Sequence, residues 1–188
     1  QVQSGDVIID STADAIGAAT GEAMFSSIAI LGGQETQITN KGDLTVTGEG
    51  DEGVGVAGKA SLLTTSGSTT RLGGSSNSSG ETEVAEGASL VALNDYALSE
   101  KSTHTIRGYL ELGDIDYHQS VDVLILKGGV ISEGILSTNE GLFSSGGDIY
   151  ARVVGPNGLV VDDRGGRGTT TLYSQQDGSS AFNDSIVI

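Results

Sequence analysis

The chain contains no cysteine, no tryptophan, one proline and one methionine in 188 residues. Without cysteine it can form no disulfide, no thiolate metal site and no cysteine nucleophile. Aromatic residues make up only 4% of the sequence, whereas binding sites for organic ligands are commonly lined by aromatic side chains. The scarcity of aromatics therefore argues against a glycosidase and against a carbohydrate-binding module.

Basic residues are also scarce. Nine Lys and Arg stand against 25 Asp and Glu, which gives a formal net charge of −16. Such a surface repels the phosphates of nucleic acids and anionic lipids. No apolar run is long enough to span a membrane. We expect no nucleic-acid partner and no membrane insertion.

The start of the chain predicts export. It begins at Gln1, and its only methionine is Met24. A signal peptide that has been removed is the simplest explanation for such a start. The sequence therefore predicts a secreted, extracellular or cell-surface protein.

Glycine, serine and threonine are abundant, with 30 glycines alone. Glycine disfavours helices and fills turns, while Val, Ile and Thr suit the pleated surface of a sheet. The composition predicts an all-β protein. Residues 12–31 are the exception, because their apolar residues recur at roughly helical spacing. A short helix near residues 12–31 and a buried strand at residues 26–31 are both compatible with that pattern.

From Gln37 onward, short alternating runs of apolar and polar residues are separated by turn residues. Asn40-Lys41-Gly42 forms a hairpin-type break, and the segment 155–158, Gly-Pro-Asn-Gly, predicts a β-hairpin between two valine-rich strands. Regularly spaced short strands with turn signals are typical of sandwiches and barrels. We predict one all-β domain over residues 1–188, a β-sandwich or jelly roll.

Residues 64–87 are polar and of low complexity, and they predict a long, exposed Ser/Gly-rich surface loop. Early proteolytic cleavage near Arg71 follows from that prediction. A two-domain chain divided at this loop is the weaker alternative. The segment before the loop has few large apolar residues with which to build a core of its own.

The stretch ITNKGDLTVTGEGDEGVGVAG, residues 38–58, resembles one rung of the parallel β-helices of bacterial autotransporter passengers. The resemblance covers about 20 residues and is not repeated later in the chain. For that reason the sandwich stays the prediction for the chain as a whole.

No motif predicts catalysis. Residues 48–53 and 53–58 both match G-x-G-x-x-G, but a dinucleotide site needs a helix directly after the glycines. The segment that follows is a poor helix former, and the acidic residues among the glycines would repel phosphate. His104 and His118 lie in apparent strands, and no G-x-S-x-G elbow is present. We expect a protein that is not an enzyme and needs no cofactor.

Acidic clusters leave calcium as the one metal to consider. Asp114 and Asp116 lie two residues apart in LGDID, and carboxylates in loops are ligands of calcium. They are the first candidates for a structural site; residues 49–52 and 162–163 are also acidic. Two N-x-S/T sequons, at Asn77 and Asn183, are candidate glycosylation sites.

Both ends of the chain are short, β-prone and apolar. An unpaired edge strand favours association with another chain. We expect the subunit interface to use the residues Val7, Ile8, Ile9, Ile186, Val187 and Ile188, with residues 1–10 as the favoured donor strand. The predicted function is a structural subunit of an extracellular filament, pilus-like fibre or surface layer, a homo-polymer assembled by β-strand addition. A cell-surface ligand- or carbohydrate-binding adhesin domain is the alternative, and a viral capsid or tail-fibre protein is the third reading.

Overall fold

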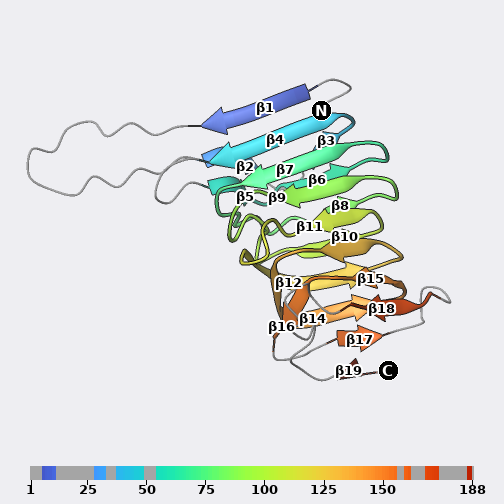
Figure 1. The fold of residues 1–188 in the computed structure, drawn as a ribbon. Helices are drawn as coiled ribbons and strands as arrows, with labels where there is room; N and C mark the ends of the chain where they lie inside the picture. Colours follow the sequence, from blue (N-terminus) through green and yellow to red (C-terminus); the bar gives the residue numbers. More distant parts are fainter. Residues whose placement is uncertain are drawn as a thin grey trace, which may run out of the picture.

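A computed structural model describes residues 6–11, 28–32, 37–48, 54–155, 159–161, 168–173 and 186–187. These residues form a β-solenoid of about six turns, in which every paired strand runs parallel to its neighbour (Figure 1). The prediction of a β-sandwich or jelly roll is therefore wrong. The strands exist, but they stack as successive rungs of one coil instead of folding back on one another.

Two long sheets form the sides of the coil. The first sheet holds, in order, β1 (Asp6–Ser11), β4 (Asp43–Gly48), β7 (Thr69–Gly73), β9 (Ser89–Ala92), β11 (Tyr109–Glu111), β13 (Val130–Ser132), β15 (Gly147–Ile149) and β18 (Thr170–Leu172).

The second sheet holds, in order, β19 (Ile186–Val187), β17 (Leu159–Val161), β14 (Ile135–Ser144), β12 (His118–Leu126), β10 (Thr103–Ile106), β8 (Thr82–Val84), β6 (Ser61–Thr64) and β3 (Gln37–Asn40). β16 (Arg152–Val154) also pairs with β14. A separate pair joins β2 (Ile28–Gly32) to β5 (Val54–Gly58).

The core is built from columns of side chains that repeat at the same register in each rung. One residue from each strand points inward and lies on the equivalent residue of the rung before it. In the first sheet this column contains Leu44, Thr70, Leu90, Leu110, Ile131 and Ile149, all buried. In the second sheet it contains Leu62, Thr82, His104, Leu124, Leu142 and Leu159, all buried.

Buried polar groups near the first rungs satisfy one another. Asn40 Nδ2 donates to Thr70 Oγ1 at 2.9 Å and to the Thr69 carbonyl at 2.7 Å. Thr64 Oγ1 lies 2.8 Å from Thr70 Oγ1. Because these groups have partners, the hydroxyls that interrupt the aliphatic columns do not carry the cost of an unmatched buried polar group.

The strands on either side of the two predicted turns do not pair as hairpins. β3 and β4 flank the turn at Lys41 and Gly42, yet they belong to different sheets. β16 and β17 flank residues 155–158, and each pairs in parallel with β14, at Ile135↔Arg152 and Leu142↔Leu159. The predicted hairpin at residues 155–158 is therefore wrong, and residues 156–158 themselves lie outside the described part.

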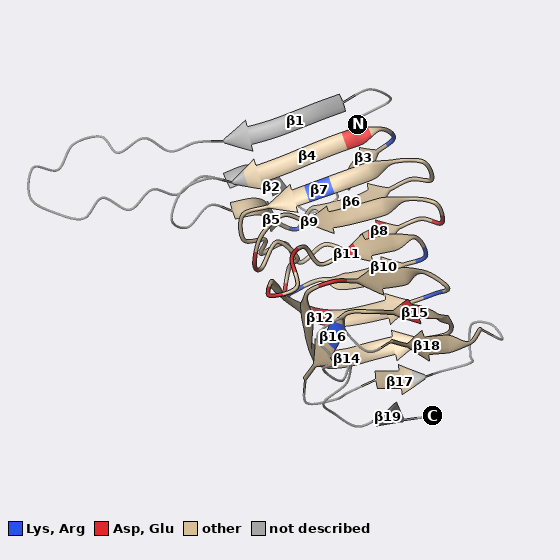
Figure 2. Ribbon diagram, viewed as in Figure 1, with Lys and Arg blue, Asp and Glu red and all other residues tan. Residues whose placement is uncertain are grey.

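The described residues contain no helix, and so none that could cross a membrane. In the ambiguous segment 12–31, residues 28–31 belong to strand β2, while residues 12–27 lie outside the described part. The stretch 38–58 that resembles an autotransporter rung provides β3, β4 and β5. Figure 2 shows acidic and basic residues distributed along the stack of rungs, in strands and in the connections between them.

The prediction of a long surface loop at residues 64–87 is also wrong. The segment contains β7 and β8, and its residues alternate between buried and accessible positions. Thr70 and Leu72 point into the core. Serine and threonine side chains are tolerated there because the coil supplies hydrogen-bond partners from the adjacent rungs.

We expect the bond after Arg71 to resist limited trypsin digestion. Arg71 lies in the middle of β7 and pairs with Thr45 on one side and with Val91 on the other. Cleavage there requires two strand pairings to open. Lys127 lies in an exposed turn and serves as the control site: the bond after Lys127 should be cut before the bond after Arg71. N-terminal sequencing of early fragments measures this order, and an early fragment beginning at Leu72 would contradict the placement of β7.

The two terminal strands pair within the chain itself. β1 lies beside β4 at Val7↔Leu44, and β19 lies beside β17 at Leu159↔Ile186. Of the predicted interface residues, Val7, Ile8, Ile9, Ile186 and Val187 belong to these strands, and Ile188 lies outside the described part. β1 is the outermost described strand of the first sheet and has a neighbour on one side only.

Candidate functional site

Two hollows lie back to back at one side of the coil, where the chain crosses from the first sheet to the second. The crossing segments are residues 74–81, between β7 and β8, and residues 93–102, between β9 and β10. The inner hollow has a volume of about 20 Å³. That is room for about one water molecule. The outer groove has a volume of about 220 Å³, and the two share Ser76 and Leu98.

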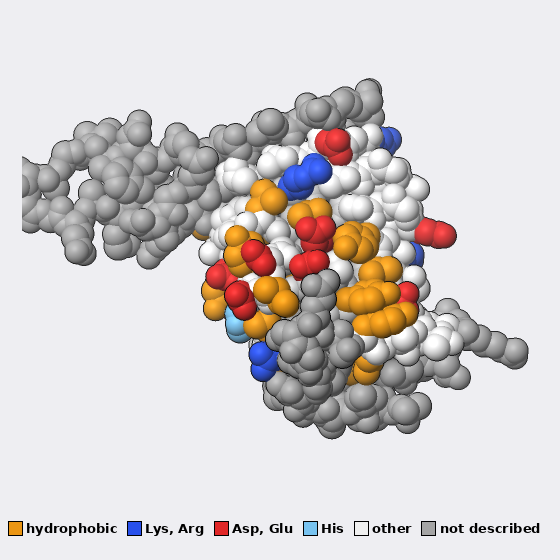
Figure 3. Space-filling view, in the orientation of Figure 1, with side chains coloured by type: hydrophobic (Ala, Val, Ile, Leu, Met, Phe, Trp, Pro, Cys, Tyr) orange, Lys and Arg blue, Asp and Glu red, His pale blue; other side chains and the backbone are white. Residues whose placement is uncertain are grey.

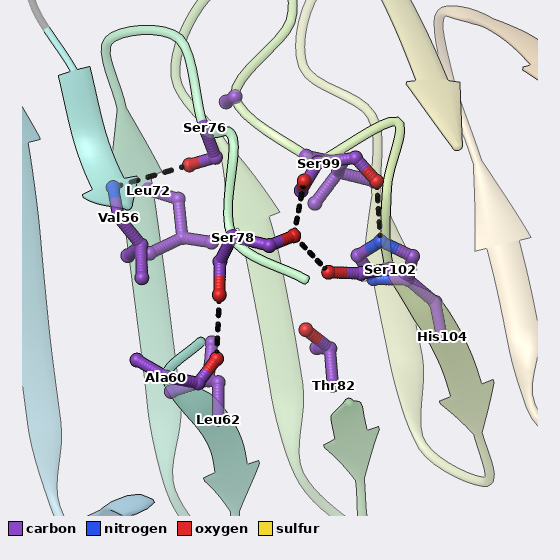
Figure 4. A pocket seen from close by; sticks show the side chains of 12 residues that line it. Val56, Ala60, Leu62, Leu72, Ser76, Ser78, Thr82, Ser99, Ser102 and His104 are labelled. Atoms are coloured by element: carbon purple, nitrogen blue, oxygen red, sulfur yellow. Dashed lines mark hydrogen bonds between the residues drawn. The ribbon is translucent and has the colours of Figure 1, made fainter. Parts of the chain in front are cut away.

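Serine side chains join the two crossing segments around the inner hollow (Figure 4). The Ser78 carbonyl accepts hydrogen bonds from Ser99 Oγ at 2.5 Å and from Ser102 Oγ at 2.6 Å. Ser78 Oγ donates to the Ala60 carbonyl at 2.7 Å. Because each of these hydroxyls donates to a main-chain carbonyl, they fix the path of the crossing segments.

His104 closes the inner hollow from β10. Its side chain is 2% exposed, and Nε2 lies 3.2 Å from the Ser99 carbonyl oxygen. A carbonyl only accepts, so Nε2 carries the proton and Nδ1 is the bare nitrogen. Nδ1 has no hydrogen-bond partner in the described part of the chain. Burial lowers the pKa of His104 to about 4, although its hydrogen bond to the Ser99 carbonyl acts in the opposite direction.

This arrangement makes His104 a neutral core residue at physiological pH. It occupies the second-sheet column between Thr82 and Leu124. The nearby hydroxyls of Ser99 and Ser102 are engaged with Ser78. Among the described residues no hydroxyl donates to the imidazole, so these residues do not form the hydrogen-bonded pair of nucleophile and base that acyl transfer needs.

The outer groove presents polar side chains around a buried apolar one. Its lining includes Ser75, Asn77, Tyr96, Leu98, Glu100 and Ser120. Leu98 is buried. The other five side chains form no hydrogen bond or ion pair with any residue that the structure describes. Within the described part of the chain, their donors and acceptors are therefore not engaged by other side chains or by the main chain. We call this hollow the Tyr96 groove.

Tyr96 has a strained backbone. Its φ is 57°, a left-handed conformation that is a genuine outlier for a bulky residue. Two main-chain hydrogen bonds hold it there: Tyr96 N donates to the His118 carbonyl at 2.8 Å, and its own carbonyl accepts from Ser76 N at 2.9 Å. The side chain is 54% exposed. The coil thus fixes an exposed aromatic ring in a conformation that the residue does not favour by itself.

The predicted calcium residues lie in a separate loop. Asp114 and Asp116 are exposed, between β11 and β12. Asp114 forms a tight turn, in which its Oδ1 accepts from Ile115 N at 2.7 Å and its carbonyl accepts from Tyr117 N at 2.9 Å. Within the described ranges no group of three or more metal-ligating side chains occurs. Residues 49–52 and 162–163 lie outside those ranges, and the calcium site stays a prediction.

Some of the other predicted positions lie within the described residues and some lie outside them. Asn77 is exposed, as a glycosylation candidate must be, and it lines the Tyr96 groove. Asn183 lies outside the described part. The second G-x-G-x-x-G match leads into β5 and β6 instead of a helix. The expectation that this glycine run does not open a helix is therefore confirmed.

An aromatic pair lies elsewhere, on the first sheet. The rings of Tyr150 and Tyr173 stack with centroids 4.0 Å apart and planes 10° from parallel. A hydrogen bond with Tyr173 is the main cause that raises the pKa of Tyr150, and burial and the nearby Asp148 add to it. The stacked pair shows that low aromatic content does not prevent local aromatic clustering.

Figure 3 shows apolar side chains lying beside carboxylates on the face in view.

Sequence reasoning missed the Tyr96 groove. Its residues come from three stretches that only the coil brings together, residues 75–77, 96–100 and Ser120. No spacing in the sequence marks them, because the rungs that join them differ in length. Comparison of the chain with protein-family models, with curated proteins and with solved structures finds no match.

Proposed function

We propose that this chain is a non-enzymatic structural subunit of an extracellular fibre or surface layer, which lengthens by end-to-end stacking of β-solenoid rungs. The observation that carries the proposal is the pair of parallel sheets that run along the coil, with β1 outermost in the first sheet. A rod whose interior is filled by side-chain columns is suited to the role of a scaffold, which supports the proposal. The resemblance of residues 38–58 to an autotransporter rung supports a place at the cell surface.

The acidic composition agrees with that place. A formal charge of −16 keeps an elongated particle soluble and disfavours non-specific contact with nucleic acid. The absence of cysteine makes folding independent of the redox state of the surroundings.

End-to-end contact requires an open strand edge. Among the described strands β1 pairs with β4 only, and its other edge is the one that we propose pairs with a second copy. A contact between unlike ends does not close on itself and therefore generates a filament. In a solenoid the added strand extends the existing sheets.

We expect concentrated wild-type protein to form rods visible by negative-stain electron microscopy, and proline at one of two adjacent positions of β1 to abolish them. Successive residues of a parallel strand direct their N–H groups to opposite sides. Of Ile8→Pro and Ile9→Pro, one therefore removes a bond to β4, and the other removes only a group on the open edge. The second variant should stay folded by circular dichroism and lose assembly.

The two variants are each other's control. Light scattering that finds the wild type monodisperse and monomeric at high concentration would rule out assembly by this chain. Rods that survive both substitutions would show that β1 is not the contact. Turnover of a substrate by the wild type, lost on substitution of His118, Ser120 or Asp116, would overturn the non-enzymatic part of the proposal.

A second candidate function is ligand binding at the cell surface, as an adhesin domain. The specific observation in its favour is the Tyr96 groove, in which five polar side chains lack partners among the described residues.

A further inference from the structure

We propose that the Tyr96 groove binds an uncharged sugar ring. The groove lies on the side of the coil, away from the strand edges at its ends, so this inference does not depend on assembly. It rests on the chemistry of the lining, the charge of the groove and the rigidity of its walls.

The lining matches the surface of a sugar. Hydroxyls from Ser75 and Ser120, the amide of Asn77 and the carboxylate of Glu100 line the groove. Together they offer hydrogen-bond donors and acceptors to a ring that carries hydroxyl groups around its edge. Leu98 and the ring of Tyr96 supply apolar surface for the C–H groups of a sugar face. Such a mixture of apolar surface and a few polar groups is typical of small-molecule sites.

The volume limits the ligand to a small one. At about 220 Å³, the groove is below the range of about 300–1,000 Å³ that is usual for drug-sized ligands. It can accept one sugar ring, with the remainder of an oligosaccharide chain in solvent.

Charge selects against anionic ligands. Glu100 is the one charged residue among the described residues that line the groove, and the formal net charge of the chain is −16. A phosphate or sulfate would meet a repulsive field there. Neutral sugars carry no such penalty, and their hydroxyls can donate to the carboxylate in charge-assisted hydrogen bonds.

The walls of the groove are set in place before any ligand arrives. The inner serines bind Ser78 to Ser99 and Ser102. Leu98 N donates to Gln119 Oε1 at 3.1 Å. A site whose walls are already ordered loses less entropy on binding. The strained residue Tyr96 fits this picture, because backbone strain concentrates at ligand clamps.

The experiment is an NMR titration of unglycosylated, isotope-labelled chain from bacterial expression, which leaves the Asn77 side chain free. The probes are methyl α-mannoside, methyl β-galactoside and N-acetylglucosamine, with glucose 6-phosphate as the anionic probe. We expect at least one neutral sugar to shift the amide signals of Ser75, Tyr96 and Ser120, with a dissociation constant on the order of 1 mM. The anionic probe should shift them less.

Variants separate the groove from other tyrosine surfaces. Tyr96→Asn should weaken binding about tenfold or more, which corresponds to about 1.4 kcal/mol, and should keep or raise the thermal midpoint, because asparagine tolerates positive φ. Tyr173→Asn, which also removes an exposed tyrosine, should bind as the wild type does. The inference is wrong if no neutral sugar shifts these signals at a sugar concentration of about ten times the expected dissociation constant. It is also wrong if glucose 6-phosphate binds more tightly than the neutral sugars, or if Tyr96→Asn binds them as tightly as the wild type does.

Discussion

Gly129→Ala should destabilise the coil by more than about 4 kcal/mol, a size reached by few single substitutions. A Cβ at this position would lie 2.4 Å from the carbonyl oxygen of Gly108 and 3.0 Å from the carbonyl carbon of Arg107. Both atoms are main chain of the rung before, so no side-chain rotation can relieve the contact.

The same contact recurs in successive rungs. A Cβ at Gly108 would lie 2.3 Å from the Ala88 carbonyl oxygen, and one at Gly147 would lie 2.3 Å from the Gly129 carbonyl oxygen. These carbonyls are also the acceptors that join the rungs, since Val130 N donates to Gly108 at 2.9 Å and Asp148 N donates to Gly129 at 3.0 Å. A methyl group between two rungs would therefore separate β11 from β13 or β13 from β15.

Gly128→Ala is the matched control. Gly128 has a φ of 81°, and a Cβ there would have no atom within 4 Å. Alanine at Gly128 meets only the cost of a left-handed conformation, about 1–2 kcal/mol. Urea unfolding of the two variants compares a steric cost with a conformational one in adjacent residues. If both variants lost the same free energy of unfolding, or if Gly128→Ala lost more, the rungs would not approach each other as closely as described.

The strands of the coil were readable from the sequence, but their pairing was not. In β7, β9 and β10 residues alternate between accessible and buried positions, which is the same pattern as a half-buried antiparallel strand. Alternation reports which face of a strand is buried. It does not report whether the neighbouring strand is parallel or antiparallel, so the prediction of a sandwich used the commoner pairing.

Unequal rung lengths hid the repeat. Thr69 pairs with Ser89, 20 positions later, whereas Asp43 pairs with Thr69, 26 positions later, and Val130 pairs with Asp148, 18 positions later. A period that varies this much leaves no fixed spacing in the sequence. Both kinds of connection change length: the turns after β6, β8 and β10 contain four, four and two residues, whereas the crossing segments 74–81 and 93–102 contain eight and ten. Those two crossing segments build most of the Tyr96 groove.

The polarity of residues 64–87 led to a wrong prediction of exposure. A run rich in serine and threonine predicts exposure when each residue is judged alone. In the coil, Thr70 has hydrogen-bond partners in Asn40 and Thr64, and Ser78 has one in Ala60. Asn40 and Ala60 belong to the rung before, so their presence depends on a register that the local sequence does not encode.

His104 should make the coil less stable in acid, and this effect should be removable by one substitution. Burial lowers the pKa of His104 from 6.5 to about 4. Below about pH 6.5 the unfolded chain binds a proton at this residue while the folded chain does not, which favours unfolding. The contribution of neutral His104 to the free energy of unfolding is therefore fully present above about pH 6.5 and is lost as the pH falls toward 4. The pKa difference corresponds to about 3 kcal/mol.

The test compares His104→Leu and His118→Gln with the wild type by urea unfolding at about pH 7 and about pH 4. Leucine suits the column that already contains Leu62, Leu124 and Leu142, all buried, although it gives up the hydrogen bond to Ser99. Between about pH 7 and about pH 4, the free energy of unfolding should fall by about 3 kcal/mol less in the His104→Leu variant than in the wild type. Carboxylates titrate equally in all three proteins, so the difference isolates the imidazole. His118 is exposed at the start of β12, and the His118→Gln variant should follow the wild type. The same pH dependence in His104→Leu and wild type would mean that His104 is not buried in the neutral form in the column between Thr82 and Leu124.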